Sequence, residues 1–295
     1  MILKKWKNFC ILGMGNHVIN KIIPALENEK KNILGVVTTK KKSKYKKFKS
    51  IHEALVILPH NTTFIIATPP EHHFRQAKEL LGYGRDIIIE KPIFVSFDEV
   101  YEIKKLADFN KTIVMEGFMH RFTYMYKIFL RFWNFNKNRI SKINTSFCIP
   151  SVPTGTFRDN KRITSSCLYD MGCYGLSLID DMGINLNKIY IDNYEKKNEN
   201  LTNVHLKGKT GNVYIDIIFG LGKTYENFIE IETINNKKVK FTPFFYGRES
   251  QKHIIKSYSK SKSNSFIDGN GFQKMFDCEL EALRQNQNER SKKNN

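Results

Sequence analysis

The stretch Phe9-Cys10-Ile11-Leu12-Gly13-Met14-Gly15-Asn16-His17-Val18 decides how the first part of this chain folds. Its apolar run, Phe9 to Leu12, predicts a buried strand, and the apolar spacing that begins at His17 predicts a helix. Gly13 permits a tight turn between them, and Gly15 lets the backbone approach a pyrophosphate, which free amides at the helix N-terminus can bind. Val18 stands where this fingerprint usually has a third glycine. The stretch therefore indicates a dinucleotide-binding turn, the alternative being a turn that merely needs two glycines.

The residues that follow alternate short apolar runs with helical patterns. Strands are predicted at 33–38, 62–67, 86–90 and 112–115, and helices at 17–28, 51–56, 71–81 and 97–109. Pro24 is expected to kink or interrupt the first helix. Strands separated by helices of this size imply right-handed crossovers and a parallel sheet that is covered on both faces. Residues 1–118 are therefore predicted to form a doubly wound Rossmann domain in an α/β chain.

From about Gly117 the pattern changes. An aromatic helix at 124–135 and an apolar helix at 165–182 accompany strand candidates at 143–148, 188–194, 204–207, 212–219, 228–233 and 237–242. Successive strands joined by polar turns predict an antiparallel sheet. We expect residues 119–284 to form an α+β substrate and oligomerisation domain with an open, mainly antiparallel sheet. A terminal helix, 272–284, is a candidate for packing back onto the first domain, and 285–295 form a polar tail.

The chain has 295 residues with 48 Lys and Arg against 29 Asp and Glu, a formal net charge of +19. Such a charge is typical of a nucleic-acid partner. The dense basic run at 40–49 has no aromatic ladder on which bases could stack, so we expect scattered solvated lysines and no specific nucleic acid. A basic protein should still attract small anionic substrates.

Cysteines, histidines and apolar runs exclude several classes of protein. The five cysteines are an odd number and none shows zinc-site spacing, which favours reduced thiols in a cytoplasm. His72 and His73 are adjacent on a predicted helix and point apart, so no metal site is expected. No apolar run approaches 18 residues, so no membrane span is expected.

The end of the second predicted strand bears on which dinucleotide is bound. NAD-binding forms carry an acidic residue here for the ribose 2′-hydroxyl. This chain has Thr39 and Lys40 instead, followed by further lysines. A hydroxyl and an ammonium would bind a 2′-phosphate that a carboxylate would repel, so NADP is predicted over NAD, which stays possible. The alternative is that Lys40 to Lys44 are simply solvated loop residues.

Four further motifs, taken together, are specific. They are Ala67-Thr68-Pro69-Pro70-Glu71-His72-His73, Gly84 to Pro92 with its Glu90-Lys91-Pro92, Glu116-Gly117-Phe118-Met119-His120-Arg121-Phe122, and Leu168-Tyr169-Asp170-Met171-Gly172-Cys173-Tyr174-Gly175. In this order the chain resembles the glucose-fructose oxidoreductase / inositol dehydrogenase (Gfo/Idh/MocA) family from Gly13 to about Leu283. Tyr174, where most of that family has histidine, and the run from Phe118 to Phe122 resemble the subgroup of glucose-fructose oxidoreductase, dimeric dihydrodiol dehydrogenase and xylose dehydrogenase.

The resemblance implies an NAD(P)-dependent oxidoreductase that acts on sugars, polyols or related compounds and forms a homodimer or homotetramer through the open sheet. It assigns Tyr174 as proton donor or acceptor and Asp170 as a substrate contact, with Glu90 and Lys91 at the nicotinamide. The resemblance, the glycine turn and the end of the second predicted strand together assign a set of residues to the coenzyme. These are Gly13, Met14, Gly15, Asn16, His17, Thr39, Lys40, Ala67, Thr68, Pro69, His73, Glu90, Lys91 and Arg121. Ser165-Ser166-Cys167 replaces a glycine triplet of the family.

The residue types also fit one reaction. Hydride transfer to a carbonyl creates an alkoxide that must be protonated, and oxidation requires the reverse. A phenol such as Tyr174 can exchange that proton when a nearby cation lowers its pKa, and Lys91 is the natural cation. Asp170 and Tyr174 are four residues apart on a predicted helix and so share a face. Taken singly, each could be structural: Lys91 a solvated lysine, Tyr174 a core tyrosine, Asp170 a local cap.

Three hypotheses follow for the function. The first is an NADP-dependent cytoplasmic oxidoreductase of a sugar or sugar derivative, with Lys91 and Tyr174 as the acid–base pair. The second is a non-catalytic NAD(P)-binding regulatory module on the same fold, which Val18 and the serines at 165 and 166 favour. The third is a nucleic-acid binder that uses the net charge. The substrate, the reaction direction and the pathway are not specified by these residues.

Overall fold

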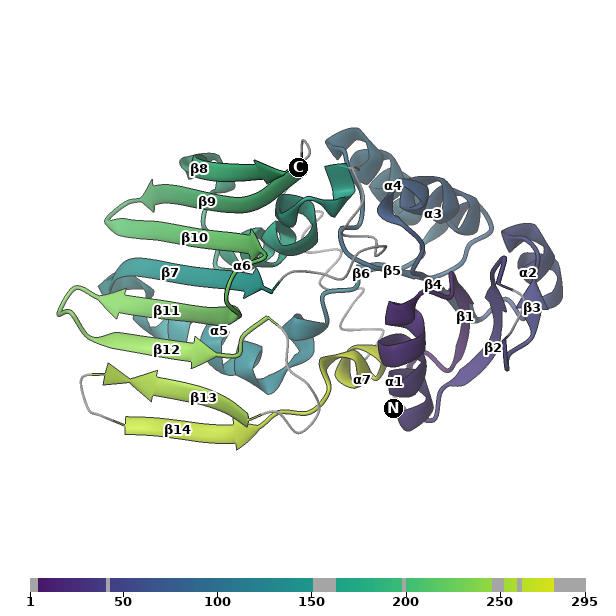
Figure 1. Ribbon diagram of the computed structural model, residues 1–295. Coiled ribbons are helices and arrows are strands. Elements are labelled where there is room, and N and C mark those ends of the chain that lie inside the picture. The colour runs from purple at the N-terminus through teal and green to yellow at the C-terminus, as the bar shows by residue number, and fades with distance from the viewer. Residues whose placement is uncertain are drawn as a thin grey trace. The chain divides into compact units, whose positions relative to one another are not determined.

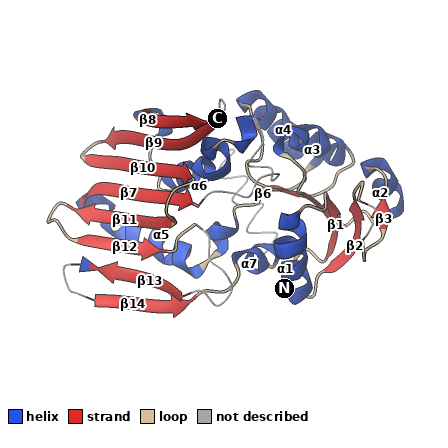
Figure 2. Cartoon of the chain, in the orientation of Figure 1, coloured by secondary structure: helices blue, strands red, loops and turns tan. Residues whose placement is uncertain are grey.

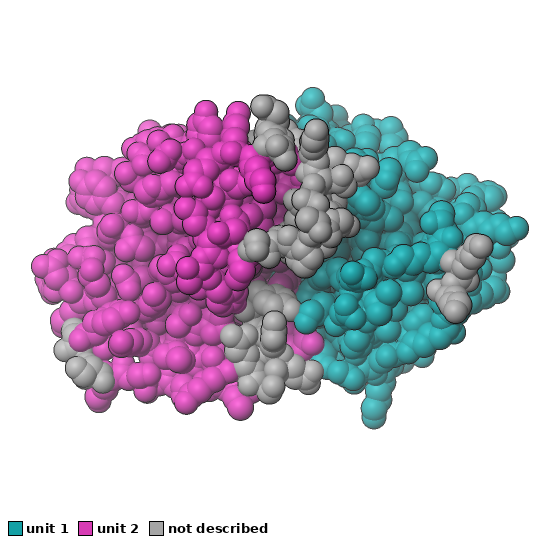
Figure 3. Space-filling view, viewed as in Figure 1, with its two compact units in different colours: residues 1–118, 272–295 teal, residues 119–271 magenta. Residues whose placement is uncertain are grey.

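The computed structural model of the chain describes residues 5–40, 43–150, 163–197, 200–245, 252–258 and 262–278. It divides into two compact units, one formed by Met1–Phe118 with Phe272–Asn295 and the other by Met119–Gly271. Figure 3 colours the first unit teal and the second magenta. Each unit is described by itself below.

The first unit contains a parallel sheet whose strand order is β3-β2-β1-β4-β5-β6. Every neighbouring pair in it is parallel, which confirms the predicted doubly wound Rossmann sheet. All residues of β4 and β5 are buried, as expected for strands covered on both faces. The strands are β1 (Asn8–Leu12), β2 (Asn32–Val37), β3 (Lys47–Phe48), β4 (Thr62–Ile66), β5 (Ile87–Ile89) and β6 (Val114–Glu116).

Helices connect most successive strands of this sheet, and two of them begin at serine N-caps. Ser50 and Ser96 each accept a hydrogen bond from the backbone N–H three residues later, which satisfies free amides at the starts of α2 and α4. The helices are α1 (Ile23–Asn28), α2 (Ile51–Ile57), α3 (His73–Gly82), α4 (Phe97–Asn110) and α7 (Gly271–Phe276), with short turns η1 (Val18–Ile22) and η2 (Pro70–His72).

Pro24 does not end the first helix, because a π-helical turn precedes it. In η1 the N–H of Ile23 donates to the carbonyl of Val18, five residues back. A proline ring clashes with the carbonyl four residues before it, and the wider turn relieves that clash. Val18 is fully buried at the start of this turn. The predicted interruption is therefore a π-helical turn before Pro24, and the buried Val18 is its first residue.

The end of the described chain belongs to the first unit. The ring of Phe276 lies 5.9 Å from that of Phe9 on β1, and Asp277 accepts hydrogen bonds from Lys5 and Lys31 at 2.6 and 3.0 Å. Of the predicted helix 272–284, the described residues show α7, which ends at Phe276, and residues 279–284 of that prediction lie outside the described part of the chain. Residues from 279 onward, including the predicted tail, lie outside the described residues.

The second unit contains a larger sheet of order β14-β13-β12-β11-β7-β10-β9-β8. Among the described strands β7 and β10 pair in parallel and all other neighbours pair antiparallel, so the mainly antiparallel sheet is confirmed. The strands are β7 (Ile140–Ile149), β8 (Ile189–Lys197), β9 (Asn200–Thr210), β10 (Val213–Leu221), β11 (Glu226–Thr233), β12 (Lys238–Thr242), β13 (Lys252–Ser257) and β14 (Lys262–Ile267).

One face of this sheet packs against the helices α5 (Tyr124–Asn136) and α6 (Cys173–Asp181), which lie on the same side in Figure 1 and Figure 2. The rings of Phe129 and Phe241 meet at 5.4 Å, and a Cβ at Gly175 would lie 2.8 Å from the Phe219 ring. The opposite face carries polar pairs such as His205 and Asp216, whose Nε2 and carboxylate oxygen lie 2.6 Å apart. Short helical turns complete the unit: η3 (Met119–Phe122), η4 (Lys137–Arg139), η6 (Ile163–Ser165), η7 (Leu168–Gly172) and η8 (Leu186–Lys188).

No helix among the described residues is long and apolar enough to cross a membrane. The strands β3, β13 and β14 were not predicted. β3 is only two residues long and lies within the basic run, and β14 is an edge strand that is exposed at all but one position.

The turn at Gly13 gives a direct test of the fold. Gly13 has a φ of +96°, and a Cβ there would lie 2.7 Å from the carbonyl oxygen of Ala67. Gly13→Ala should therefore lower the free energy of unfolding by about 2 kcal/mol or more, measured by urea denaturation. The matched control is Gly82→Ala at the end of α3, where no atom lies within 4 Å of the new Cβ. An equal loss of stability in both variants would contradict this account.

Candidate functional site

The carboxyl edge of the first sheet collects the residues that the sequence assigns to a coenzyme. In a parallel sheet all strands end at the same edge, and the order of this one reverses between β1 and β4. The glycine turn follows β1, residues 38–40 follow β2, residues 67–69 follow β4, and Glu90 follows β5. Ligands of such sheets bind outside the carboxyl ends of the strands at that switch point.

The glycine turn itself has the form that a pyrophosphate requires. The N–H of Gly13 donates to the carbonyl of Val37 on β2 at 2.9 Å, which fixes the start of the turn. The carbonyl of Gly15 accepts the N–H of Ile19 at 3.1 Å, so the helix begins within the turn. A Cβ at Gly15 would meet no atom within 4 Å, and Gly15, Asn16 and His17 are exposed. The turn therefore leaves open space in front of free helix amides, and its residues fit a dinucleotide.

Thr39 and Lys40 are exposed and come directly after the strand end that Gly13 contacts. The backbone N–H of Lys40 donates to the hydroxyl of Thr38 at 3.2 Å, which shapes this loop. Of the neighbouring lysines, Lys44 is held by Glu27 at 2.6 Å. Exposed hydroxyl and ammonium groups beside the glycine turn can bind a phosphate.

His73 joins the loops that follow β4 and β5. Its ring is buried, with Nε2 at 2.9 Å from the carbonyl oxygen of Thr68 and Nδ1 at 3.1 Å from those of Pro92 and Ile93. Burial lowers the pKa of His73, against hydrogen bonds to these carbonyls that raise it. The hydroxyl of Thr68 donates to Gln76 at 2.6 Å. His73 thus fixes the loop of Ala67, Thr68 and Pro69 against the Glu90-Lys91-Pro92 turn, while His72 is exposed.

Glu90 contacts the end of the glycine turn through His17. Its backbone N–H donates to Ile66 on β4 at 2.9 Å, and its carboxylate lies 3.2 Å from His17 Nε2. The Glu90 side chain is 13% exposed. Burial raises the pKa of this carboxyl, but the charges of His17, Lys91 and His73 and the hydrogen bond from His17 outweigh burial and hold it below its ordinary value. Glu90 is therefore a carboxylate at neutral pH, and Lys91 beside it is half-buried.

The predicted substrate residues of the second unit lie on η7 and α6. Tyr174 is buried, its hydroxyl lies 3.8 Å from Met119 Sδ, and its ring packs against His120, Phe147 and Phe245. Asp170 is buried in the π-helical turn that leads into α6, so a single α-helix does not connect it to Tyr174. Gly172 and Gly175 bring this segment close to the ring of Phe219.

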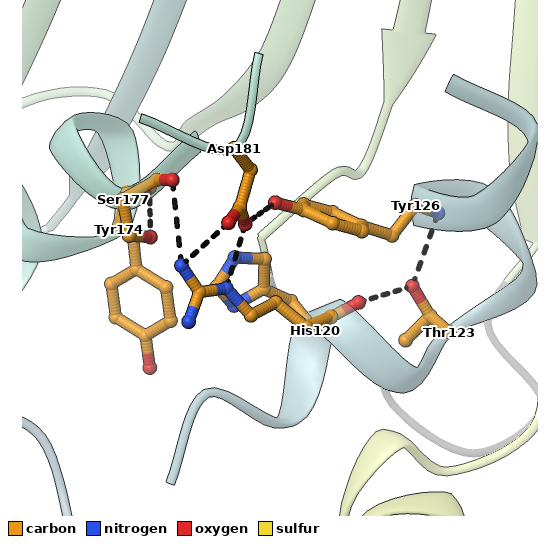
Figure 4. A network of polar contacts seen from close by, with 7 residues as sticks. His120, Thr123, Tyr126, Tyr174, Ser177 and Asp181 are labelled. Atoms are coloured by element: carbon orange, nitrogen blue, oxygen red, sulfur yellow. Dashed lines mark hydrogen bonds and ion pairs between the residues drawn. The ribbon is translucent and has the colours of Figure 1, made fainter. Parts of the chain in front are cut away.

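A polar network holds α6 in place (Figure 4). Asp181, with its side chain 8% exposed, accepts hydrogen bonds from Arg121 Nε at 2.7 Å and Nη2 at 3.0 Å, and also from the hydroxyl of Tyr126. Burial raises the pKa of Tyr126, and Asp181 adds to that effect. Arg121 Nη2 also donates to the carbonyl of Ser177, whose hydroxyl donates to the carbonyl of Tyr174 at 2.9 Å. The network therefore ties the helix that carries Tyr174 to η3 and α5.

The structure brings the predicted coenzyme residues of the first unit to one sheet edge and packs Tyr174 close to His120. Lys91 belongs to the first unit and Asp170, Arg121 and Tyr174 to the second, so their pairing stays a prediction, as does a coenzyme contact by Arg121. His120 is buried among aromatic rings, and burial and the Arg121 charge lower its pKa well below the ordinary value.

Sequence reasoning missed Asp181 and the contact between His17 and Glu90. An aspartate in the last turn of an apolar helix opposes the helix dipole, and this signal could have pointed to a buried cation for Asp181. Of the serines that replace the glycine triplet, Ser165 accepts a hydrogen bond from Asn200 at 3.0 Å, whereas Ser166 is buried and its hydroxyl has no partner among the described residues.

Comparisons with solved structures show the fold of the whole chain. KijD10, a 3-ketoreductase from Actinomadura kijaniata in complex with NADP and TDP-benzene, is similar with a TM-score of 0.78 and 15% identity over 95% of this chain and 89% of that chain. Aldose-aldose oxidoreductase from Caulobacter crescentus, complexed with glycerol, has a TM-score of 0.77 and 11% identity over 96% and 89% of the two chains. The probable oxidoreductase yhhX has a TM-score of 0.71 and 13% identity over 95% and 89%.

A search of curated proteins found no match. Residues 7–118 match the family described as the oxidoreductase family with an NAD-binding Rossmann fold, GFO_IDH_MocA. These are the residues that form the parallel sheet and present the glycine turn at its carboxyl edge. Over these residues the match agrees with the family that the motifs indicated, and it tests neither the motif at 168–175 nor the subgroup. Residues 7–118 thus match the NAD-binding Rossmann domain of the Gfo/Idh/MocA oxidoreductase family.

Proposed function

We propose that this chain is an NADP-preferring oxidoreductase that transfers a hydride between its nicotinamide coenzyme and a hydroxyl-bearing or carbonyl carbon of a sugar or sugar derivative. One observation carries the proposal: the glycine turn presents open space at Gly15 and a helix start at the switch point of a parallel sheet. The family match over the same residues supports an oxidoreductase with an NAD(P) coenzyme.

The residues that would hold the coenzyme are those of the carboxyl edge. The turn from Gly13 to His17 would bind the pyrophosphate, and the loop from Ala67 to Pro69, fixed by His73, would line its path. The resemblance puts the nicotinamide beside Glu90 and Lys91. When bound, the coenzyme supplies or accepts the hydride, so the protein must provide the proton.

Lys91 and Tyr174 are the proposed acid–base pair. In the reducing direction a hydride adds to the carbonyl carbon while the phenol of Tyr174 gives its proton to the carbonyl oxygen, and oxidation runs the other way. A cation beside the phenol stabilises its deprotonated form, which is the role proposed for Lys91. Asp170 would orient a substrate hydroxyl. The buried packing of Tyr174 among His120, Phe147 and Phe245 supports a fixed position for the phenol.

The sugar class of the substrate is supported by the structural neighbours. KijD10 is described as a 3-ketoreductase in complex with NADP and TDP-benzene, and a second neighbour as an aldose-aldose oxidoreductase. The second description points to an aldose sugar, and the TDP-benzene of the first points to a substrate that carries a nucleotide. The proposal also includes a cytoplasmic location and a homodimer or homotetramer formed through the face of the second sheet opposite α5 and α6, both following from the sequence arguments.

Removing the hydroxyl of Tyr174 tests the acid–base assignment. Tyr174→Phe should lower kcat at least about 100-fold, because proton transfer is lost, while the Kd for NADPH changes less than about twofold. Turnover is measured as NADPH consumption with sugars and nucleotide-linked sugars, and Kd by fluorescence titration. Tyr169→Phe, on the preceding π-helical turn, is the control and should keep normal turnover. Near-normal kcat in Tyr174→Phe would remove this residue from the mechanism.

The Asp181 network should support Tyr174 through α6. Asp181→Asn removes the charge that Arg121 pairs with inside the second unit, so it should lower the free energy of unfolding by about 2 kcal/mol and reduce kcat. The Kd for NADPH should stay unchanged. Asp180→Asn, one residue earlier and exposed, is the control. Equal stability of both variants in urea would show that the Arg121–Asp181 pair contributes nothing measurable.

Charge reversal after β2 tests the choice of NADP. Changing Thr39 and Lys40 together to Asp should raise the Kd for NADPH at least about tenfold while the Kd for NADH changes little, because only the former carries a 2′-phosphate. Lys49→Asp, elsewhere in the same basic run, controls for the general loss of positive charge. If both variants weaken NADPH equally, residues 39 and 40 do not recognise the 2′-phosphate.

A further inference from the structure

One residue of the loop after β4 is held by two side chains of α3. His73 Nε2 lies 2.9 Å from the carbonyl oxygen of Thr68, and the Thr68 hydroxyl donates to Gln76 Oε1 at 2.6 Å. His73 and Gln76 are three residues apart on α3 and therefore share a face of that helix. Thr68 is thus fixed both through its backbone and through its side chain.

Thr68 also lies directly beside the glycine turn. A Cβ at Gly13 would lie 2.7 Å from the carbonyl oxygen of Ala67 and 3.3 Å from the backbone nitrogen of Thr68. The N–H of Ala67 donates to the carbonyl of Leu12 on β1 at 3.0 Å, so the loop begins against the end of that strand. Thr68 and Gln76 are both half-buried. Thr68 therefore lies at the switch point of the sheet, where such folds bind a dinucleotide.

The order of the strands indicates which half of a dinucleotide this loop faces. In doubly wound sheets the pyrophosphate lies at the first glycine turn, and the end of the second strand recognises the adenosine ribose. Here β2 and β4 lie on opposite sides of β1. The loop after β4 is therefore on the side of the remaining half, the nicotinamide nucleotide. The hydrogen-bond donors of that half are its ribose hydroxyls and its carboxamide.

We propose that Gln76 is a positioning residue that acts through Thr68 and makes its hydroxyl oxygen an acceptor for a donor of the nicotinamide half. The inference rests on the proposed function, which puts a dinucleotide at this edge. A threonine hydroxyl has one proton and two acceptor lone pairs, and it rotates to suit its partners. Because Gln76 takes the proton, the oxygen presents lone pairs to a ribose hydroxyl or to the carboxamide. It then has no proton to offer to a phosphate group, which only accepts.

The experiment measures Kd by calorimetry for NADPH and for 2′,5′-ADP, which carries the adenosine half alone. The ratio of the two Kd values is the informative quantity, because a general change in the charge or stability of this edge affects both ligands. Thr68→Val should raise the ratio roughly five- to tenfold, the usual effect of losing one neutral hydrogen bond. Gln76→Leu should raise it roughly threefold, since the hydroxyl then rotates freely. Thr68→Ser, which keeps the hydroxyl, should keep the wild-type ratio.

A double variant separates a role through Thr68 from an independent role of Gln76. Thr68→Val combined with Gln76→Leu should give the ratio of Thr68→Val alone, because no hydroxyl is left for Gln76 to orient. Glu79→Leu, three residues further along α3 and also half-buried, is the matched control and should keep the wild-type ratio. Effects that multiply in the double variant would overturn the inference, and so would an unchanged ratio in Thr68→Val.

A coenzyme analogue with an acetyl group in place of the carboxamide identifies the donor. If the effect of Thr68→Val disappears with this analogue, the carboxamide is the donor; if it persists, a ribose hydroxyl is. Either result supports the acceptor role of Thr68. An equal rise of the Kd values for NADPH and 2′,5′-ADP in Thr68→Val would overturn that role. If the wild-type protein binds neither NADPH nor NADH, the proposed function fails instead, so the two failures are distinguishable.

Discussion

The turn after β1 can pass the end of β4 only because residue 13 has no side chain. A Cβ at this position would lie 2.7 Å from the carbonyl oxygen of Ala67, and the N–H of Gly13 also donates to Val37 on β2. One glycine therefore touches the strands on both sides of β1 at the point where the strand order reverses. Everything at this edge follows from that close approach, because it sets where the helix amides point and brings His17 over Glu90.

The second unit depends on a buried aspartate, Asp181, that binds side chains from neighbouring elements. Asp181 accepts hydrogen bonds from Arg121 and Tyr126, and through Ser177 the same arginine reaches the turn of α6 that carries Tyr174. A charge buried in this way is tolerated because it is paired with the Arg121 guanidinium and accepts a further hydrogen bond from Tyr126. The candidate site residues of the two units therefore differ in their exposure to solvent. The first keeps exposed backbone amides near its site, whereas the second packs its phenol among rings and secures the helix behind it.

Local patterns predicted much of this molecule. Apolar runs such as Thr62 to Ile66 identified the parallel strands, since a strand covered on both faces needs no alternation. Two glycines after the first strand predicted the tight turn at the carboxyl edge of the sheet. The missed elements lack such signals: β3 is two residues long, and the edge strand β14 is largely exposed and so has no apolar row. The pair of His17 with Glu90 joins distant residues, so only the assembled sheet reveals it.

The first unit is discontinuous along the chain, and this has a consequence for its synthesis. Phe276 packs on Phe9, and Asp277 binds Lys5 and Lys31, yet the whole second unit lies between these partners in sequence. On a ribosome the opening strand emerges first and must wait, with the surface later covered by Phe276 open to water, until residues 119–271 have been made. A chaperone that binds the nascent chain would therefore encounter a Rossmann sheet that still lacks Phe276 and Asp277.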